Sequence, residues 1–316
     1  MRLSVIYPLQ PSDPRQVAPF ARLAARFAPS RLWMGQSLRI DAYAMFAHLA
    51  GMGVRVPLGV SVGLMPLRDP LEAAIQARSL AALTGRPLVA GFGASTPRFV
   101  EALRGAPYEN PAKAAATYAT SVRSALTGGR GGLPPLPTAP IEVGLGVLRP
   151  RMARLAAGAA DVVITWLTPH RYIREQIVPA LDAGTPAGAT RPRIVAIVPM
   201  ALSAAGRDVT RIAEAGSARH LSAPHYADML RRAGAHYPEG DTAAGARALV
   251  EAGAFLTGTV EDVVAALAGY RDCGVDEVVL STAGLMAQDG PAAAITELEA
   301  VLSAATAGAD TECRAS

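Results

Sequence analysis

The sequence predicts a (β/α)8 barrel, in which eight parallel strands form a closed cylinder inside a ring of helices. Eight short apolar runs divide the 316-residue chain, and each is followed by a stretch with apolar residues at helical spacing. Most runs are apolar throughout instead of alternating, which is typical of strands buried on both faces. The expected strands are residues 3–7, 32–34, 58–62, 88–93, 141–146, 161–166, 193–200 and 276–281. An open, doubly wound sheet is the alternative, but eight units in 316 residues fit a barrel better.

The segments between the runs predict the helices. After the third run, Leu71, Ile75, Leu80 and Leu83 recur at helical spacing. Residues 201–275 are more than one barrel helix requires, so we expect a helical insertion between the seventh and eighth strands. The glycine- and proline-rich stretch 128–140 and a polar tail, residues 307–316, lie outside the regular units. We therefore expect one domain, residues 1–306, followed by a flexible tail.

Composition narrows the class of protein. Hydrophobic residues make up 51% of the chain and its mean hydropathy is +0.24, yet no apolar run is long enough to cross a membrane. No signal peptide is recognisable, which predicts a cytoplasmic protein. The net charge of +4 is spread along the chain without a basic tract, so we expect no nucleic-acid partner. The spacing of His220, His225 and Asp228 does not fit one helix face, and no metal site is expected.

In such a barrel the functional groups lie at the carboxyl ends of the strands. The third run contains a G-x-S-x-G pattern around Ser61, which in a hydrolase would mark the nucleophile. That chemistry needs a helix directly after the serine, whereas Pro66 and Pro70 delay the next helix until about Asp69. A hydrolase therefore remains a weak alternative.

Other strand ends offer groups for an anionic or planar ligand. Gly91 and Gly93 would let a ring or phosphate approach the backbone without obstruction by a Cβ atom. Arg149 precedes a helix start at which backbone amides could bind phosphate, although a plain surface arginine is the alternative. After the sixth run, residues 166–171 supply an aromatic wall, a hydroxyl group and two possible cations.

Three collinear blocks then match a known family. They begin VPLGVSVGLMPLRDP at residue 56, RMARLAAGAADVVITW at residue 151 and GTVEDVVAALAGYRDCGVDEVVL at residue 258. Over residues 1–284 the chain resembles the luciferase-like, coenzyme F420-dependent oxidoreductases of the methylenetetrahydromethanopterin reductase type. The resemblance implies the same barrel and a deazaflavin at the strand ends. It also implies that the third strand ends in a bulge with a non-prolyl cis peptide behind the ring, at Ser61-Val62.

The resemblance and the strand ends together give a set of candidate cofactor-binding residues: Ser61, Val62, Gly91, Gly93, Ala94, Ser95, Val147, Leu148, Arg149, Trp166, Thr168 and His170. Three positions depart from the family pattern. Many relatives have an acidic residue and a histidine after the second strand, where this chain has Gln36 and Ser37. A glutamate is replaced by Thr117 before Tyr118, and a common glycine is replaced by Arg149.

These departures indicate a reaction that needs little side-chain acid catalysis. We expect reduced coenzyme F420 to give a hydride to an activated C=C or C=N bond, with Gln36, Ser37 and Tyr43 as the catalytic residues on the substrate side. The resemblance makes a natural-product intermediate, including a dehydroamino-acid peptide, a plausible substrate, and it implies a homodimer. The alternatives are an FMN-dependent monooxygenase and a barrel without a cofactor that acts as a binding protein.

Overall fold

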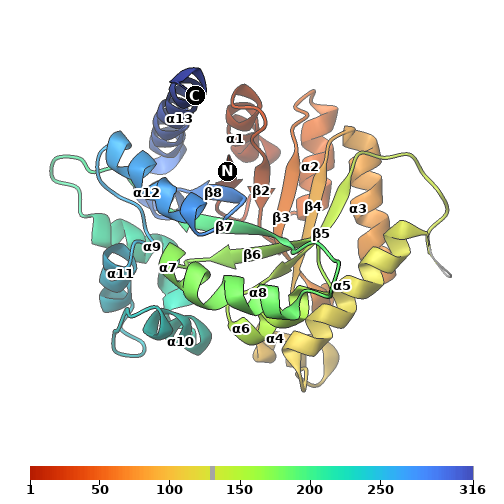
Figure 1. The fold of residues 1–316 in the computed structure, drawn as a ribbon. Helices are drawn as coiled ribbons and strands as arrows, with labels where there is room; N and C mark the ends of the chain where they lie inside the picture. Colours follow the sequence, from red (N-terminus) through yellow and green to blue (C-terminus); the bar gives the residue numbers. More distant parts are fainter. Residues whose placement is uncertain (129–131, 316) are drawn as a thin grey trace.

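The eight predicted strands form one closed parallel barrel in sequence order (Figure 1). A computed structural model describes residues 1–128 and 132–315, with side chains to residue 308, so part of the 128–140 stretch lies outside the described residues. The strands are β1 (Arg2–Tyr7), β2 (Leu32–Met34), β3 (Leu58–Leu64), β4 (Leu88–Gly93), β5 (Ile141–Gly146), β6 (Val162–Trp166), β7 (Arg193–Pro199) and β8 (Glu277–Ser281). Because β8 pairs with β1 as well as with β7, the open-sheet alternative is wrong.

Helices surround the barrel. They are α1 (Pro14–Arg26), α2 (Ala42–Gly51), the 3-10 turn η1 (Met65–Leu67), α3 (Pro70–Thr84), α4 (Pro97–Arg104), α5 (Pro111–Thr127), α6 (Pro150–Ala156), α7 (His170–Tyr172), the π-helical turn η2 (Ile173–Ile177), α8 (Val178–Gly184), α9 (Val209–Leu221), α10 (Pro224–Arg232), α11 (Thr242–Glu251), α12 (Val260–Asp272) and α13 (Ala283–Ala315). None of the helices within the described ranges is long and apolar enough to cross a membrane.

The long connection between β7 and β8 is helical, as predicted. It contains α9 to α12, and Figure 1 shows α9, α10 and α11 gathered on one side of the barrel. After β8, α13 bends at Gly290-Pro291, where Gly290 has a φ of 85°. The helix then continues beyond residue 307, through the stretch for which we expected a polar tail.

The buried face of α3 differs from the predicted one. Of the four apolar residues used to predict this helix, only Leu80 is buried, whereas Leu71, Ile75 and Leu83 are 45%, 41% and 66% exposed. The face against the barrel is formed mainly by small residues: Ala73, Ala74, Ala77 and Ala81. Alanines allow a helix to approach a sheet closely, so spacing predicted the helix correctly but the size of the residues decided its orientation.

Glycines on β3, β4 and β5 make room for large side chains inside the barrel. A Cβ atom on Gly59 would collide with the Trp33 ring, and one on Gly91 would collide with the Val60 carbonyl oxygen and Ile164 Cδ1. A Cβ on Gly144 would lie 3.0 Å from the same Ile164 atom. The interior is therefore packed by fitting bulky residues of some strands against glycines of others.

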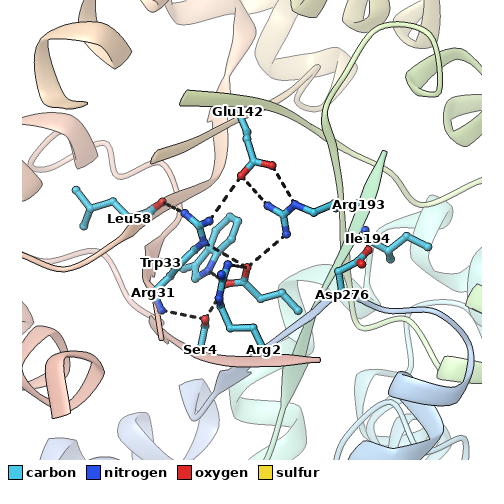
Figure 2. A network of polar contacts seen from close by, with 10 residues as sticks. Arg2, Ser4, Arg31, Trp33, Leu58, Glu142, Arg193, Ile194 and Asp276 are labelled. Carbon is cyan, nitrogen blue, oxygen red and sulfur yellow. Dashed lines mark hydrogen bonds and ion pairs between the residues drawn. The ribbon is translucent and has the colours of Figure 1, made fainter. Parts of the chain in front are cut away.

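A partly buried ionic network, which we call the barrel floor, lies at the amino-terminal end of the barrel and consists of Arg2, Ser4, Arg31, Trp33, Glu142, Arg193 and Glu277 (Figure 2). Glu277 is fully buried. Its Oε1 accepts hydrogen bonds from Ser4 Oγ at 2.7 Å and Trp33 Nε1 at 2.8 Å. Its Oε2 faces Arg2 at 3.2 Å and Arg31 at 3.3 Å.

Arginines outnumber carboxylates in the floor, and Glu142 compensates part of the excess. It receives Arg193 through two hydrogen bonds of 2.9 and 2.7 Å, and it lies 3.6 Å from Arg31. Burial lowers the pKa of Arg31 while Glu277 opposes that change, but a guanidinium group remains charged in proteins. The floor is thus a set of paired charges with one arginine in excess, and the pairing is consistent with a structural role for this end of the barrel.

Candidate functional site

The end of β3 has the irregular backbone that the resemblance implied. The pairing of β3 with β4 shifts register between Val60 and Gly63, and the Ser61-Val62 peptide bond is cis. The strand continues to Leu64 and α3 begins only at Pro70, so Ser61 does not occupy a nucleophile elbow. The Ser61 hydroxyl is buried, and among the described residues it has no hydrogen-bond partner.

The structure corrects our interpretation of Gly91. Its Cβ position is directed at Val60 and Ile164, so the missing side chain makes room inside the barrel wall and does not open an approach for a ring. At Gly93 a Cβ would lie 2.6 Å from Val62 Cγ2, and at Gly146 it would lie 3.5 Å from Val62 Cγ1. The side chain of Val62 therefore occupies the space beside both glycines at the barrel mouth, by which we mean the carboxyl ends of the strands.

The connections after β4 and β6 contain two non-glycine residues with positive φ angles. Ser95 has φ 68° directly after β4, and Leu167 has φ 55° directly after β6. Such conformations are costly and are often found at functional sites. Ala94 and Ser95 are half-buried at the mouth.

In the connection after β5, Arg149 already has an anionic partner. Its Nε lies 2.9 Å from Asp228 Oδ2 on α10, and the same carboxylate faces Arg232 at 3.2 Å and Arg231 at 3.8 Å. Three guanidinium groups thus share one carboxylate, which leaves a local excess of positive charge beside Leu148. Val147 is buried, with its amide bonded to the Ile164 carbonyl at 2.8 Å.

After β6, Trp166 lies at the mouth, whereas two residues that we grouped with it have structural contacts. The indole Nε1 of Trp166 is buried without a partner in the described chain, and its ring packs 5.5 Å from His220 of α9. Thr168 is buried and its hydroxyl donates to the Trp166 carbonyl. The His170 ring packs against Tyr270 and Gly269 of α12.

Arg68, which we did not predict, organises the polar residues after β2. It donates to Gln36 Oε1 at 2.9 Å, forms an ion pair with Asp41, and lies 5.6 Å from the centre of the Tyr43 ring. The carbonyl of Arg68 accepts a hydrogen bond from Tyr118 at 3.2 Å. Arg68 lies in the connection between β3 and α3, after η1 and directly before the N-cap Asp69, so its place after a strand was the signal available in the sequence.

The three predicted catalytic residues differ in whether their side chains already have hydrogen-bond partners within the described chain. Ser37 Oγ accepts from the amides of Arg39 and Ile40, so it shapes the turn. The Gln36 side chain donates to the Ser37 carbonyl. In contrast, the hydroxyl of Tyr43 is buried and, within the described ranges, has no partner. Burial raises the pKa of Tyr43, so its hydroxyl stays protonated.

A cleft of about 680 Å³ opens beside this group. It lies between the β3–α3 connection and helices α4 and α5, and its lining includes Arg68, Asp69, Arg104, Lys113 and Tyr118. Tyr118 packs 5.2 Å from Phe92 of β4, so the inner wall of the cleft adjoins the strand ends.

Comparison with known proteins agrees with the fold. The sequence model of the family described as luciferase-like monooxygenase matches residues 2–277. Among curated proteins, none matches the sequence.

Three solved structures illustrate the range of similar barrels. The coenzyme F420-dependent tetrahydromethanopterin reductase of Methanopyrus kandleri is 18% identical, with a TM-score of 0.68 and coverage of 96% of this chain and 97% of that one. An F420-dependent secondary alcohol dehydrogenase, solved with an F420–acetone adduct, is 13% identical, with a TM-score of 0.68 and coverage of 95% and 98%. The oxygenating constituent of 3,6-diketocamphane monooxygenase from Pseudomonas putida, solved with FMN, is 15% identical, with a TM-score of 0.62 and coverage of 95% and 96%.

Proposed function

Because the chain belongs to the luciferase-like monooxygenase family, we propose that it is a coenzyme F420-dependent reductase acting on an activated C=C or C=N bond. The similar barrels include oxidoreductases that depend on F420 and a monooxygenase component that was solved with FMN. The choice of F420 and of reduction rests on the sequence resemblance and on the site. An FMN-dependent monooxygenase is the second candidate, because an FMN-containing barrel matches the fold almost as well.

The hydrogen bonds and ion pairs of the residues after β2 support the proposal that the reaction is a reduction. Oxidation of an alcohol requires a base to accept the hydroxyl proton. Here Gln36 cannot act as a base, the Asp41 carboxylate is held by Arg68 and caps α2, and Ser37 accepts two backbone hydrogen bonds. Such a site suits hydride transfer to a bond that the substrate itself has activated, for which orientation is the main task of the protein.

The unpartnered polar groups at the mouth fit a planar, polar cofactor. When bound, the reduced deazaflavin supplies the hydride. Ser61 Oγ and Trp166 Nε1 are buried hydrogen-bonding groups without partners in the described chain, and such groups are costly unless a ligand or water satisfies them. We assign them to cofactor contacts, together with Val62, Gly93, Ala94, Ser95, Val147 and Leu148 as walls.

Tyr43 is the residue that we assign to proton delivery. Its hydroxyl remains protonated because burial raises the pKa, and it has no competing acceptor in the described part of the chain. Arg68 packs over the ring and holds Gln36 by a hydrogen bond, so we assign these residues to orienting the substrate.

The proposal is tested by titrating the purified protein with oxidised coenzyme F420 and with FMN, following the fluorescence of each chromophore. Selective binding of F420, together with oxidation of reduced F420 by an unsaturated acceptor without oxygen, is the expected result. Selective FMN binding with oxygen consumption would establish the monooxygenase instead. Binding of neither would favour a barrel that serves as a binding protein.

We also propose that the chain forms a homodimer through the exposed face of α3, where Leu71 and Ile75 lie one turn apart. Glutamates at both positions should convert the dimer to a monomer, because burying two charges in an apolar contact is unfavourable. Light scattering after size-exclusion chromatography measures the mass. Leu136→Glu, at a loop residue that is 49% exposed, is the control.

A further inference from the structure

We infer that the insertion between β7 and β8 supplies a further ligand-binding residue to the barrel mouth: His220 of α9, which together with Trp166 holds an uncharged hydroxyl or carbonyl group of the bound cofactor. This inference rests on the proposed function and extends it to a residue outside the strands and their direct connections to the next helix. In the sequence, His220 was considered only as a metal ligand, for which its spacing is unsuitable.

Helix α9 brings the insertion into contact with the carboxyl ends of β6 and β8. The His220 ring lies 5.5 Å from the Trp166 ring, centre to centre, at an angle of 54°. One turn earlier on the same helix, a Cβ atom on Gly216 would lie only 2.7 Å from the amide nitrogen of Gly284, just after the end of β8. Helix α9 therefore packs across the ends of two strands of the mouth, and His220 contacts one of them.

Polar groups at this contact lack partners. His220 Nδ1 and Trp166 Nε1 are both buried, and among the described residues neither has a hydrogen-bond partner. The hydroxyl groups of Ser217, one turn before His220 on α9, and of Ser281, at the end of β8, are buried in the same way without partners in the described ranges. Each such group costs free energy unless a ligand or water satisfies it. Together these four groups indicate that a polar part of the ligand lies on this side of the mouth.

The end of β8 faces the same interior as Trp166. Val279 and Ile197 belong to the interior cluster against which Trp166 packs. The strand register aligns Trp166 with Ile197, and Ile197 with Val279. Side chains two residues apart on a strand point to the same face, so Ser281 faces inward above Val279. Ser281 and Trp166 thus both face the inside of the barrel at the mouth, while His220 contacts Trp166 from α9.

The His220 imidazole is uncharged at neutral pH. Burial is the main cause that lowers the pKa of His220 to about 4, and Arg219 and His225 act in the same direction. The Tyr226 ring packs 5.2 Å from His220 and is also uncharged, because burial raises the pKa of its hydroxyl. A neutral imidazole has one donor and one acceptor nitrogen, and an indole has only a donor. The two rings therefore suit a hydroxyl or carbonyl group, which needs no counter-charge.

The test measures binding of oxidised coenzyme F420 and of FMN to the full-length protein and its variants by chromophore fluorescence. His220→Phe keeps a ring but removes both nitrogen atoms, so we expect it to weaken binding of the preferred chromophore about tenfold. His220→Asn keeps a hydrogen-bonding atom as many bonds from the backbone as Nδ1, and should bind within about threefold of wild type. His225→Phe is the matched control, because this histidine belongs to the same insertion and its ring contacts Tyr226.

Circular dichroism checks the folding of each variant, and His220→Ala replaces His220→Phe if the latter does not fold. Wild-type affinity in the variant without the imidazole would overturn the inference. An equal loss in His220→Asn or in His225→Phe would also overturn it, because the effect would then be one of packing and not of the hydrogen-bonding nitrogen.

The chromophore that the wild type prefers distinguishes failure of this inference from failure of the proposed function. If the wild type selects F420 and His220→Phe binds it normally, the F420 assignment stands and the role of His220 is wrong. If the wild type selects FMN and His220→Phe weakens that binding, His220 is a ligand contact and the F420-dependent reductase is wrong. Binding of neither chromophore would overturn both.

Discussion

The two tryptophans of the chain pack against the same interior cluster, yet their indole N–H groups meet opposite surroundings. At the barrel floor, Trp33 is fully buried and donates to Glu277 at 2.8 Å. At the mouth, Trp166 is only partly buried and its Nε1 has no partner in the described chain. The indole at the floor is thus satisfied by a carboxylate of the protein, whereas the indole at the mouth is a donor without a partner in the described chain.

The difference shows how one barrel separates stability from function. At the floor, Glu277 and Glu142 form ion pairs with Arg2, Arg31 and Arg193, and these pairs join residues from distant parts of the chain. The mouth differs in three ways: it has polar groups without partners in the described chain, two non-glycine residues with positive φ, and a neighbouring cleft. Each of these features is typical of a ligand-binding site.

The largest effect is expected at the floor, from Glu277→Gln. The amide can still accept from Trp33 and Ser4, but it leaves the buried Arg31 and the half-buried Arg2 without this counter-charge. Loss of a buried partner of this kind costs about 3–5 kcal/mol of unfolding free energy. Urea denaturation measures it, with the exposed Glu251→Gln as control. A cost as small as that of the control would show that the floor is not an energetic unit.

Gly91→Ala is expected to cost about 1–3 kcal/mol, because the new methyl group meets Val60 and Ile164 inside a packed wall. Gly51→Ala is the comparison, since nothing lies within 4 Å of its Cβ position. We expect that change to stay within about 0.5 kcal/mol. If Gly91→Ala folds with normal stability but loses F420 binding, then our original reading of Gly91 as a cofactor contact would be restored.

The matched pair Trp33→Phe and Trp166→Phe tests the comparison most directly. Trp33→Phe removes a satisfied hydrogen bond to buried Glu277 and should cost about 1–3 kcal/mol in stability. Trp166→Phe breaks no hydrogen bond in the described chain, so it should cost less than about 1 kcal/mol while weakening F420 binding about tenfold. Denaturation and fluorescence titration of both variants are required. Normal F420 binding by Trp166→Phe would remove this indole from the site.

The smallest effect is a pH dependence at the mouth. Burial lowers the pKa of His220 to about 4, with further lowering by Arg219 and His225. The unfolded chain therefore binds the proton more readily, and this contribution to stability is complete above about pH 6.5 and is lost as the pH falls toward 4. Unfolding free energies of wild type and His220→Phe at pH 7 and 4.5 should show a smaller loss in the variant. An equal loss would assign the pH dependence to other groups.

Local patterns predicted most of the fold. Continuous apolar runs gave the strands, and α3 was found from Leu71, Ile75, Leu80 and Leu83, although three of these face outward. The site was predicted less completely. Ser61-Val62 was placed correctly because a short sequence block carries the backbone irregularity, whereas Arg68, Asp228 and His220 were missed or dismissed because their contacts join separate elements.

The sequence alone therefore determined the barrel, the irregular end of β3 and the family, since all of these depend on the order of residues within short segments. Only the tertiary structure decided which polar groups are already satisfied. The space beside Gly91 is filled by Ile164, Arg149 forms an ion pair with Asp228, and the indole N–H of Trp166 has no partner among the described residues. The reason is physical: whether a group is free to bind a ligand depends on what the rest of the chain brings within about 3 Å of it, and that neighbour comes from a different strand or helix.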